Sequence, residues 1–283
     1  MPFQTLVTAE QLAAHQDDPH WVIFDCRFTL TDLDAGRRAY TKAHIEGSHY
    51  ADLEKDLSSP VTPESGRHPL PDPQQLVGKL SAWGVDNQSQ VVVYDDAFGA
   101  IACRLWWLLR WLGHHNVALL DGGLPRWTRE GYGLTSSASA SSPARFEARV
   151  DDDLWVTSQF VEQGTQAEGI VLIDARAEER FNGEREPLDK VAGHVPGAIN
   201  IPYDDNLAFS GQLLEAEELK EVYSAAMGTK ASQDVVHMCG SGVTACHNIL
   251  AMELAGLGGS KLYVGSWSEW ITDKRRSTLS PTT

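Results

Sequence analysis

The sequence repeats itself, and this repeat restricts the possible folds more than any other feature of the chain. Four short motifs occur twice, in the same order and at a nearly constant offset. Residues 22–27 match residues 171–176, 43–48 match 193–198, 91–95 match 235–239, and 119–123 match 262–266. Trp127 and Trp270 follow the last pair at the same spacing. Ordered matches of this kind indicate that the chain contains two copies of one domain.

Each copy alternates short strands rich in Val and Ile with stretches of helical pattern. This alternation predicts an α/β fold, in which a mostly parallel sheet is flanked by helices on both faces. A small, polar and patternless segment separates the copies and is typical of a linker. We therefore predict an N-terminal domain over residues 1–134, a linker over 135–144 and a C-terminal domain over 145–283.

Cys239 opens the run Cys-Gly-Ser-Gly-Val-Thr in the second copy. Residues 233–238 before it read as a short buried strand, and residues 245–254 after it have apolar side chains at helical spacing. The N–H groups of a Gly-rich loop and the start of a helix both stabilise a thiolate, which is the nucleophilic form of cysteine. The sequence thus predicts Cys239 as an active-site nucleophile. The alternative is a small buried Cys at a strand end.

Asp95 occupies the matching position in the first copy. A carboxylate is a far weaker nucleophile than a thiolate. We therefore expect the first domain to be catalytically silent and to contribute side chains to a cleft between the domains.

The composition argues against several classes of function. A formal net charge of −16 disfavours nucleic acid or an anionic membrane as a partner. The four cysteines form no CxxC pair and no zinc-like set with His, so we expect reduced thiols, no metal and no cofactor. We also expect a cytoplasmic protein, because no signal-peptide pattern and no apolar run of membrane-spanning length are present.

The loop at Cys239 resembles the active-site loop of 3-mercaptopyruvate sulfurtransferases, two-domain relatives of rhodanese. The Asp-x-Arg motif at Asp174 and the Gly-His-x-Pro-Gly motif at Gly193 are similar to those of rhodanese domains, and the resemblance runs from about Thr8 to Trp270. It implies two tandem rhodanese-like domains with the active site in the second. The loop residues that would hold the transferred sulfur are Gly240, Gly242, Val243 and Thr244.

The resemblance also implies a proton relay. In these enzymes a Ser of the loop works beside a His and an acid of the first domain. Ser241 matches that Ser, and His68 in Gly-Arg-His-Pro-Leu-Pro matches the His. Glu54 falls where the family has Asp, so its side chain is one methylene longer.

Arg180 matches the first of two arginines that bind the carboxylate of the donor in the family. The alternative for Arg180 is a structural ion pair with Glu178, Glu179 or Glu184. The second family Arg follows about nine residues later, but here that loop is two residues shorter. Arg185 is the nearest candidate for it, with Lys190 in reserve.

These assignments predict a sulfurtransferase. The Cys239 thiolate attacks the sulfur of 3-mercaptopyruvate, pyruvate leaves as its enolate, and the resulting persulfide passes its sulfur to thioredoxin, a small dithiol or cyanide. Thiosulfate is the alternative donor, but this dianion favours cations beside the Cys, which Gly240 and Ser241 do not supply. A Cys-dependent phosphatase would need an Arg after Thr244, which the chain lacks. A non-enzymatic binding module would not need the intact Cys239 loop.

Overall fold

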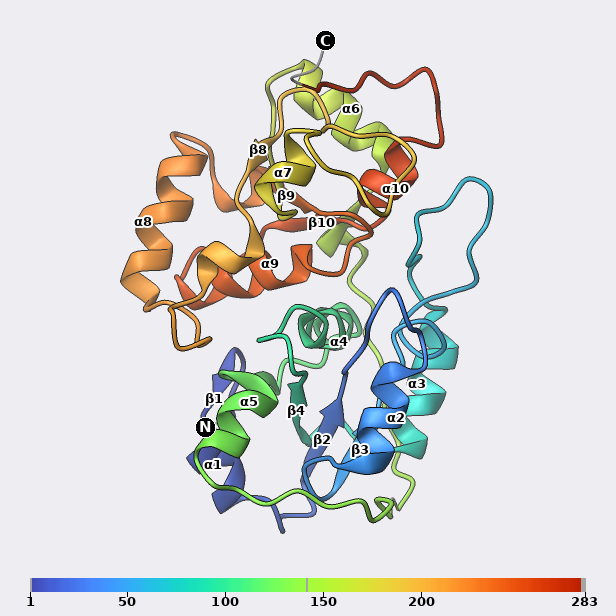
Figure 1. Cartoon of the computed structure of the whole chain (residues 1–283), viewed down its shortest axis with the longest axis vertical. Helices are drawn as coiled ribbons and strands as arrows, with labels where there is room; N and C mark the ends of the chain where they lie inside the picture. Colours follow the sequence, from blue (N-terminus) through green and yellow to red (C-terminus); the bar gives the residue numbers. More distant parts are fainter. Residues whose placement is uncertain (1, 141, 281–283) are drawn as a thin grey trace. The chain divides into compact units, whose positions relative to one another are not determined.

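The computed structural model describes residues 2–140 and 142–280, and the chain divides into two compact units (Figure 1). The first unit comprises Met1–Ser59, Leu70–Asp151 and Phe209–Gln212. The second comprises Pro60–Pro69, Asp152–Ala208 and Leu213–Thr283. Each unit thus includes a short segment that the sequence order would assign to the other, and Pro60–Pro69 carries His68 into the second unit.

The first unit is built on a five-stranded parallel sheet with the order β1-β5-β4-β2-β3. Its strands are β1 (Leu6–Val7), β2 (Trp21–Asp25), β3 (Ser48–Tyr50), β4 (Gln90–Tyr94) and β5 (Val117–Leu120). Its helices are α1 (Ala9–Ala14), α2 (Ala35–Lys42), α3 (Pro73–Ala82), α4 (Ala102–Trp111) and α5 (Gly123–Arg129). The chain returns through helices between neighbouring strands, as parallel pairing requires.

The second unit repeats this topology with the order β6-β10-β9-β7-β8, again all parallel. Its strands are β6 (Trp155–Val156), β7 (Val171–Asp174), β8 (Ile199–Asn200), β9 (Val235–Met238) and β10 (Lys261–Tyr263). Its helices are α6 (Ser158–Gln166), α7 (Glu178–Phe181), α8 (Ala216–Met227), α9 (Ala245–Leu254) and α10 (Ser266–Trp270). Short 3₁₀ turns lie at Asp152–Leu154, Tyr203–Asn206 and Ser232–Asp234. The predicted α/β fold with a repeated parallel sheet is therefore confirmed.

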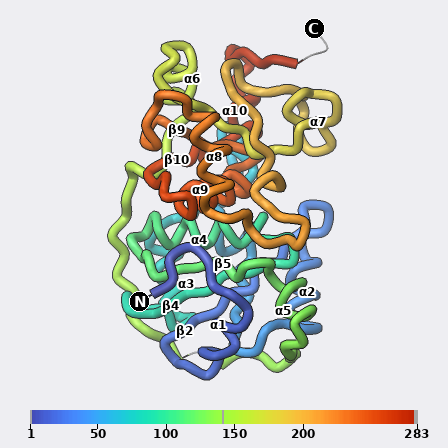
Figure 2. Tube along the Cα trace, turned by 90° about the vertical axis from the view of Figure 1, so that its left-hand side faces the viewer, coloured from blue at the N-terminus to red at the C-terminus, as the bar shows by residue number. Residues whose placement is uncertain are grey.

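Corresponding residues fill the two cores. Val7, Ile23 and Val92 of the first sheet pack with Leu12 and Trp127. The residues at the matching positions of the second unit, Val156, Leu172, Val236, Val161 and Trp270, form its core. Figure 2 follows the chain through β2, β4 and β5 of the first sheet and through β9 and β10 of the second. Each copy thus buries its own apolar face, which explains why the apolar motifs of the sequence occur twice.

The two Asp-x-Arg motifs form buried ion pairs inside each unit. Arg27 binds both carboxylate oxygens of Asp25, and Arg176 binds those of Asp174 in the same way. Each guanidinium also donates to a backbone carbonyl, of Ala43 in the first unit and of Gly193 in the second. Because both copies share these contacts, their function is to hold the carboxyl end of a central strand in place.

The described residues of the predicted linker, 135–140 and 142–144, belong to the first unit. Thr135 forms an isolated bridge with His44, the Ser139 hydroxyl donates to the Ser48 carbonyl at 2.6 Å, and the Ala144 N–H donates to Ser81. Residues 145–151 also pack on the first unit, whereas the sequence analysis assigned them to the C-terminal domain. Backbone hydrogen bonds, such as those from Arg149 to Leu112 and from Asp151 to Trp111, hold these residues on the first unit. Contacts of this kind leave no side-chain pattern in the sequence, so the sequence could not reveal the position of this segment. None of the helices in the two described stretches is long and apolar enough to cross a bilayer.

Candidate active site

The loop between β9 and α9 places Cys239 at the carboxyl end of a central strand of the second sheet. The backbone of Cys239 is fixed on both sides: its N–H donates to the Ser266 hydroxyl at 3.1 Å, and its carbonyl accepts from the Trp267 N–H at 3.0 Å. Gly242 has a φ of +74°, and a Cβ there would collide with the Val264 carbonyl oxygen. Glycine is therefore required at this position to give the loop its shape.

The Cys239 thiol is buried, with 2% of the residue exposed. Burial alone does not single it out, because Cys26, Cys103 and Cys246 are buried as well. The Sγ of Cys246 lies on the first turn of α9 and donates to the Gly242 carbonyl at 3.4 Å. Cys246 thus links the first turn of the helix to the loop. Cys239 differs from the other cysteines in the polar side chains around its loop, which are described below. Val243 is buried, and Thr244 is the N-cap residue of α9.

A buried hydrogen bond joins Ser241 to His68. The Ser241 hydroxyl lies 2.7 Å from Nδ1 of His68, and the two residues are 5% and 2% exposed. The structure therefore brings together two of the residues that the resemblance assigned to a proton relay. They come from the β9–α9 loop and from Pro60–Pro69, both within the second unit.

Glu54 lies in the first unit, in the turn that follows β3. Its backbone N–H donates to the Asp52 carboxylate at 3.1 Å, and its side chain is partly exposed. A catalytic role for Glu54 stays a prediction.

Arg180 is held by two acidic side chains of the loop that follows α7. Its Nε and Nη2 bind both carboxylate oxygens of Glu186 at 2.9–3.2 Å, and Nη2 also donates to Asp189 at 3.1 Å. The ion-pair alternative named Glu178, Glu179 and Glu184, so it named the wrong partners. Sequence proximity favoured residues on or just after the same short helix, whereas the loop folds back and brings Glu186 and Asp189 inward.

The surroundings shift the pKa values of both acids, in opposite directions. Burial alone would raise the pKa of Glu186, but hydrogen bonds from Arg180 and from the N–H groups of Leu188 and Asp189 outweigh it and lower this pKa. The pKa of Asp189 is raised, first by burial and further by the charge of Glu186, although Arg67 and Arg180 oppose the shift. The same loop therefore holds one acid whose charged form is favoured and one whose charged form is disfavoured.

The two candidates for a second carboxylate-binding cation lie at the surface. Arg185 and Lys190 are exposed, and within residues 142–280 neither has an ion pair in the structure. Lys190 lines a cavity of about 520 Å³ together with Arg67, Asp189 and Ser268. The assignment of Arg185 as the second cation gains no support from this geometry.

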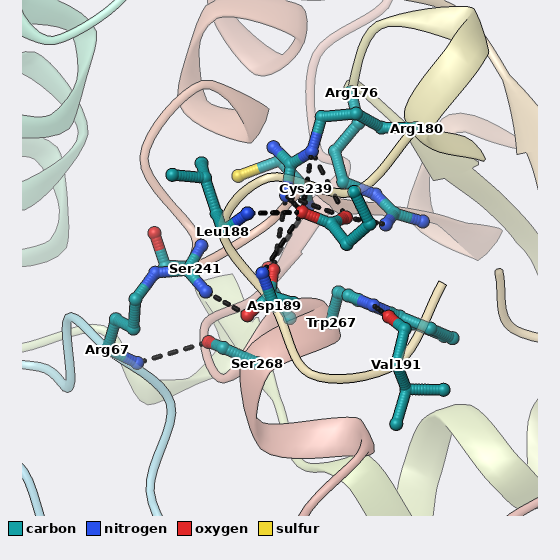
Figure 3. A network of polar contacts seen from close by, with 12 residues as sticks. Arg67, Arg176, Arg180, Leu188, Asp189, Val191, Cys239, Ser241, Trp267 and Ser268 are labelled. Carbon is teal, nitrogen blue, oxygen red and sulfur yellow. Dashed lines mark hydrogen bonds and ion pairs between the residues drawn. The ribbon is translucent and has the colours of Figure 1, made fainter. Parts of the chain in front are cut away.

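The sequence analysis missed Arg67, which lies against the Cys239 loop. A Cβ built on Gly240 would be 2.8 Å from Nη2 of Arg67 and 3.5 Å from both terminal nitrogens of Arg180. Figure 3 shows Arg67 and Arg180 reaching Asp189 from different segments of the chain, beside Cys239 and Ser241. Gly240 and Ser241, the chain neighbours of Cys239, carry no positive charge, but Arg67 brings a cation to the loop from a distant segment. The available signal was the position of Arg67 directly before His68.

The Rhodanese-like domain family model matches residues 8–130 and 157–273 of the chain. The chain belongs to the rhodanese family. It is 50% identical over 273 residues to the probable 3-mercaptopyruvate sulfurtransferase of Pseudomonas aeruginosa, with 96% of each chain covered. It is 32% identical to thiosulfate sulfurtransferase of Rattus norvegicus over 93% of this chain and 89% of that protein. SseA of Escherichia coli, described as a 3-mercaptopyruvate sulfotransferase, superposes with a TM-score of 0.80 at 33% identity, covering 94% of this chain and all of that one.

In this rhodanese-family chain, the first copy fills its loop with its own carboxylate. Asp95 follows β4 as Cys239 follows β9, and its two carboxylate oxygens accept four backbone N–H groups at 2.8–2.9 Å. The donors are Ala97, Gly99, Ile101 and Ala102. The backbone N–H groups of the loop in the first unit thus bind an anion, and this anion is the carboxylate of Asp95 itself. Among residues 2–140 and 142–280, no group of three His, Cys, Asp or Glu side chains is arranged to hold a metal.

Proposed function

We propose that this protein is a sulfurtransferase, which moves a sulfur atom from 3-mercaptopyruvate to a thiol acceptor or to cyanide through a persulfide on Cys239. The observation that carries the proposal is the buried hydrogen bond between Ser241 and His68. Ser241 lies two residues after the nucleophile in the same loop. A proton relay at this place is needed when the leaving group is a carbon anion, because the anion has to be protonated. The similarity to named 3-mercaptopyruvate sulfurtransferases supports the same activity.

The first half-reaction follows from these groups. The Cys239 thiolate attacks the thiol sulfur of the donor, a new S–S bond forms, and the S–C bond breaks with its electron pair on carbon. Pyruvate departs as its enolate. Ser241 protonates the methylene carbon and takes a proton back through His68. In the net reaction the donor's thiol proton ends on the methyl group of pyruvate, and Cys239 carries the persulfide anion.

The second half-reaction returns the enzyme to its thiolate form. An acceptor thiolate attacks the outer sulfur of the persulfide, so the acceptor becomes a persulfide and Cys239 leaves as a thiolate. A dithiol protein such as thioredoxin, or a small dithiol, can then release the sulfur as sulfide by closing its own disulfide. Such acceptors and reduced cysteines fit a cytoplasmic protein, and we propose this location.

Thiosulfate is the second candidate donor, and one observation favours it. The guanidinium groups of Arg67 and Arg180 lie against Gly240, so cations are present beside the nucleophile after all. Sulfite, however, leaves without protonation at carbon, and the Ser241–His68 pair has no task in that reaction. We therefore place 3-mercaptopyruvate first.

A comparison of the two donors tests the proposal. With purified protein and cyanide as the common acceptor, kcat/KM for 3-mercaptopyruvate should exceed that for thiosulfate by at least about tenfold, or 1.4 kcal/mol. His68→Ala should reduce turnover of 3-mercaptopyruvate much more than turnover of thiosulfate. A wild-type preference for thiosulfate would contradict the proposal, and equal losses with both donors would mean that His68 has no part in proton transfer.

A further inference from the structure

We infer that Arg67 is the second cation that binds the donor's carboxylate, together with Arg180; this inference rests on the proposed function. The two guanidinium groups lie close to the same point beside Gly240. A Cβ on Gly240 would be 2.8 Å from Nη2 of Arg67 and 3.5 Å from Nη1 of Arg180. Gly240 directly follows the nucleophile, so a small donor whose sulfur reaches Cys239 has its other end within reach of this pair.

Each guanidinium uses one part for the protein and presents another part to Gly240. Arg67 pairs with Asp189 through Nη1, while its Nε is buried and has no hydrogen-bond partner in the described part of the chain. The hydrogen bonds of Arg180 to Glu186 and Asp189 run from Nε and Nη2. Nη2 of Arg67 and Nη1 of Arg180 both lie close to Gly240 and take part in none of these contacts, so they are available to a carboxylate, which suits two-pronged binding.

Hydrogen bonds to the Cys239 loop, through Ser268, fix the position of the Arg67 backbone. Its backbone N–H donates to the Ser268 hydroxyl at 3.1 Å, and the Ser268 N–H donates to the Gly240 carbonyl at 2.9 Å. Gly66, just before it, lies so close to the Gly265 carbonyl that a side chain there would collide with it. The Arg67 backbone is thus tied through Ser268 to Gly240 itself, and its side chain is already held by the ion pair with Asp189, which reduces the cost of ordering this side chain when the donor binds.

The Asp189 carboxylate shows that the two guanidinium groups beside Gly240 can bind a carboxylate. Asp189 lies between Arg67 and Arg180 and binds one with each oxygen. A donor carboxylate adds a further negative charge to this cluster. Burial, followed by the charge of Glu186, raises the pKa of Asp189 against the opposing effect of Arg67 and Arg180, and these two guanidinium groups balance the added charge. The loop after α7 supplies acids on this side and keeps its cations, Arg185 and Lys190, at the surface.

The test measures binding of pyruvate, the product that carries the same carboxylate, by calorimetry in a Cys239→Ser background. Arg67→Gln should weaken pyruvate binding at least about tenfold, the loss expected for one charge-assisted contact. Lys190→Gln is the matched control, because it removes one positive charge from the same cavity without a contact to Gly240, and it should change the affinity less than twofold. In the enzyme with Cys239 intact, Arg67→Gln should raise KM for 3-mercaptopyruvate by a similar factor.

A second variant guards against an effect on folding. Gly240 has no positive φ, so Gly240→Ala fits the backbone, but its methyl group points at Nη2 of Arg67 and should weaken pyruvate binding about tenfold with Arg67 still in place. Unchanged affinity in both Arg67→Gln and Gly240→Ala, or equal losses in Arg67→Gln and Lys190→Gln, would overturn the inference. The proposed function fails separately, if the wild-type protein forms no Cys239 persulfide from 3-mercaptopyruvate.

Discussion

At the scale of single residues, Cys239 and Cys246 provide a matched pair, because both are buried, one in the β9–α9 loop and the other in the first turn of α9. Cys239→Ser should abolish transfer, since a hydroxyl is a poor nucleophile toward sulfur. Cys246→Ser should keep most activity, because a serine hydroxyl can still donate to the Gly242 carbonyl. Steady-state assays with both donors measure this, and substantial turnover by the Cys239 variant would rule out the persulfide mechanism.

Arg180 has two tasks, and its removal should show both. Arg180→Ala should lower kcat/KM for 3-mercaptopyruvate by tenfold or more, through loss of a charge-assisted contact worth about 1.5–3 kcal/mol. It should also destabilise the fold by about 3 kcal/mol, because Glu186 and Asp189 are only 4% and 5% exposed and lose a partner. Denaturant unfolding measures the second effect. A kinetic loss without a stability loss would mean that the ion pairs do not hold the loop.

At the scale of elements, the sequence predicted the strands and helices, whose apolar residues recur at a regular spacing. It did not predict the position of irregular segments, which lack such a spacing. The strand expected over 233–238 is β9 at Val235–Met238, preceded by a 3₁₀ turn, and the helix expected over 245–254 is α9 with the same bounds. Pro60–Pro69 has no such period, and its position depends on individual contacts, such as those of Arg67 with Ser268 and Asp189. These contacts join residues far apart in the sequence, so the sequence revealed His68 through a motif but not Arg67.

Strand β9 also carries a histidine that makes stability depend on pH. His237 is fully buried against Tyr223 and Met252, and burial lowers its pKa to about 3. An unfolded histidine, with a pKa of about 6.5, binds a proton below that pH that the folded state does not bind. Folding stability is therefore unaffected above pH 6.5 and falls as the pH decreases from 6.5 toward 3.

His237→Gln should remove this dependence. Between pH 7 and pH 5 the wild-type protein should lose about 2 kcal/mol more unfolding free energy than the variant, from a slope of about 1.4 kcal/mol per pH unit. The measurement is urea denaturation at pH 7, 6 and 5. His20→Gln, at an exposed site, serves as the control and should follow the wild type. Parallel curves for the wild type and His237→Gln would show that His237 is protonated in the folded state.

At the scale of the whole molecule, duplication gave two sheets with the same strand order and two loops with different contents. The repeat in the sequence was sufficient to predict the topology, because core residues at equivalent positions build both units. It could not predict the hydrogen bonds and ion pairs that surround each loop. Asp95 satisfies four backbone N–H groups in the first unit, whereas the second unit has a thiol at that position, with Ser241, His68 and two arginines around its loop.

This difference predicts how much sulfur one chain can hold. After treatment with excess 3-mercaptopyruvate without an acceptor, the protein should gain a single sulfur atom, about 32 Da, on the peptide that contains Cys239. The first unit should gain none, because Asp95 already satisfies its amides and cannot form a persulfide, while Cys26 and Cys103 are buried with no exposed surface. Intact and peptide mass spectrometry measure this, with cyanide treatment as the control that should remove the added mass. A second sulfur on the first unit would show that this unit is not silent.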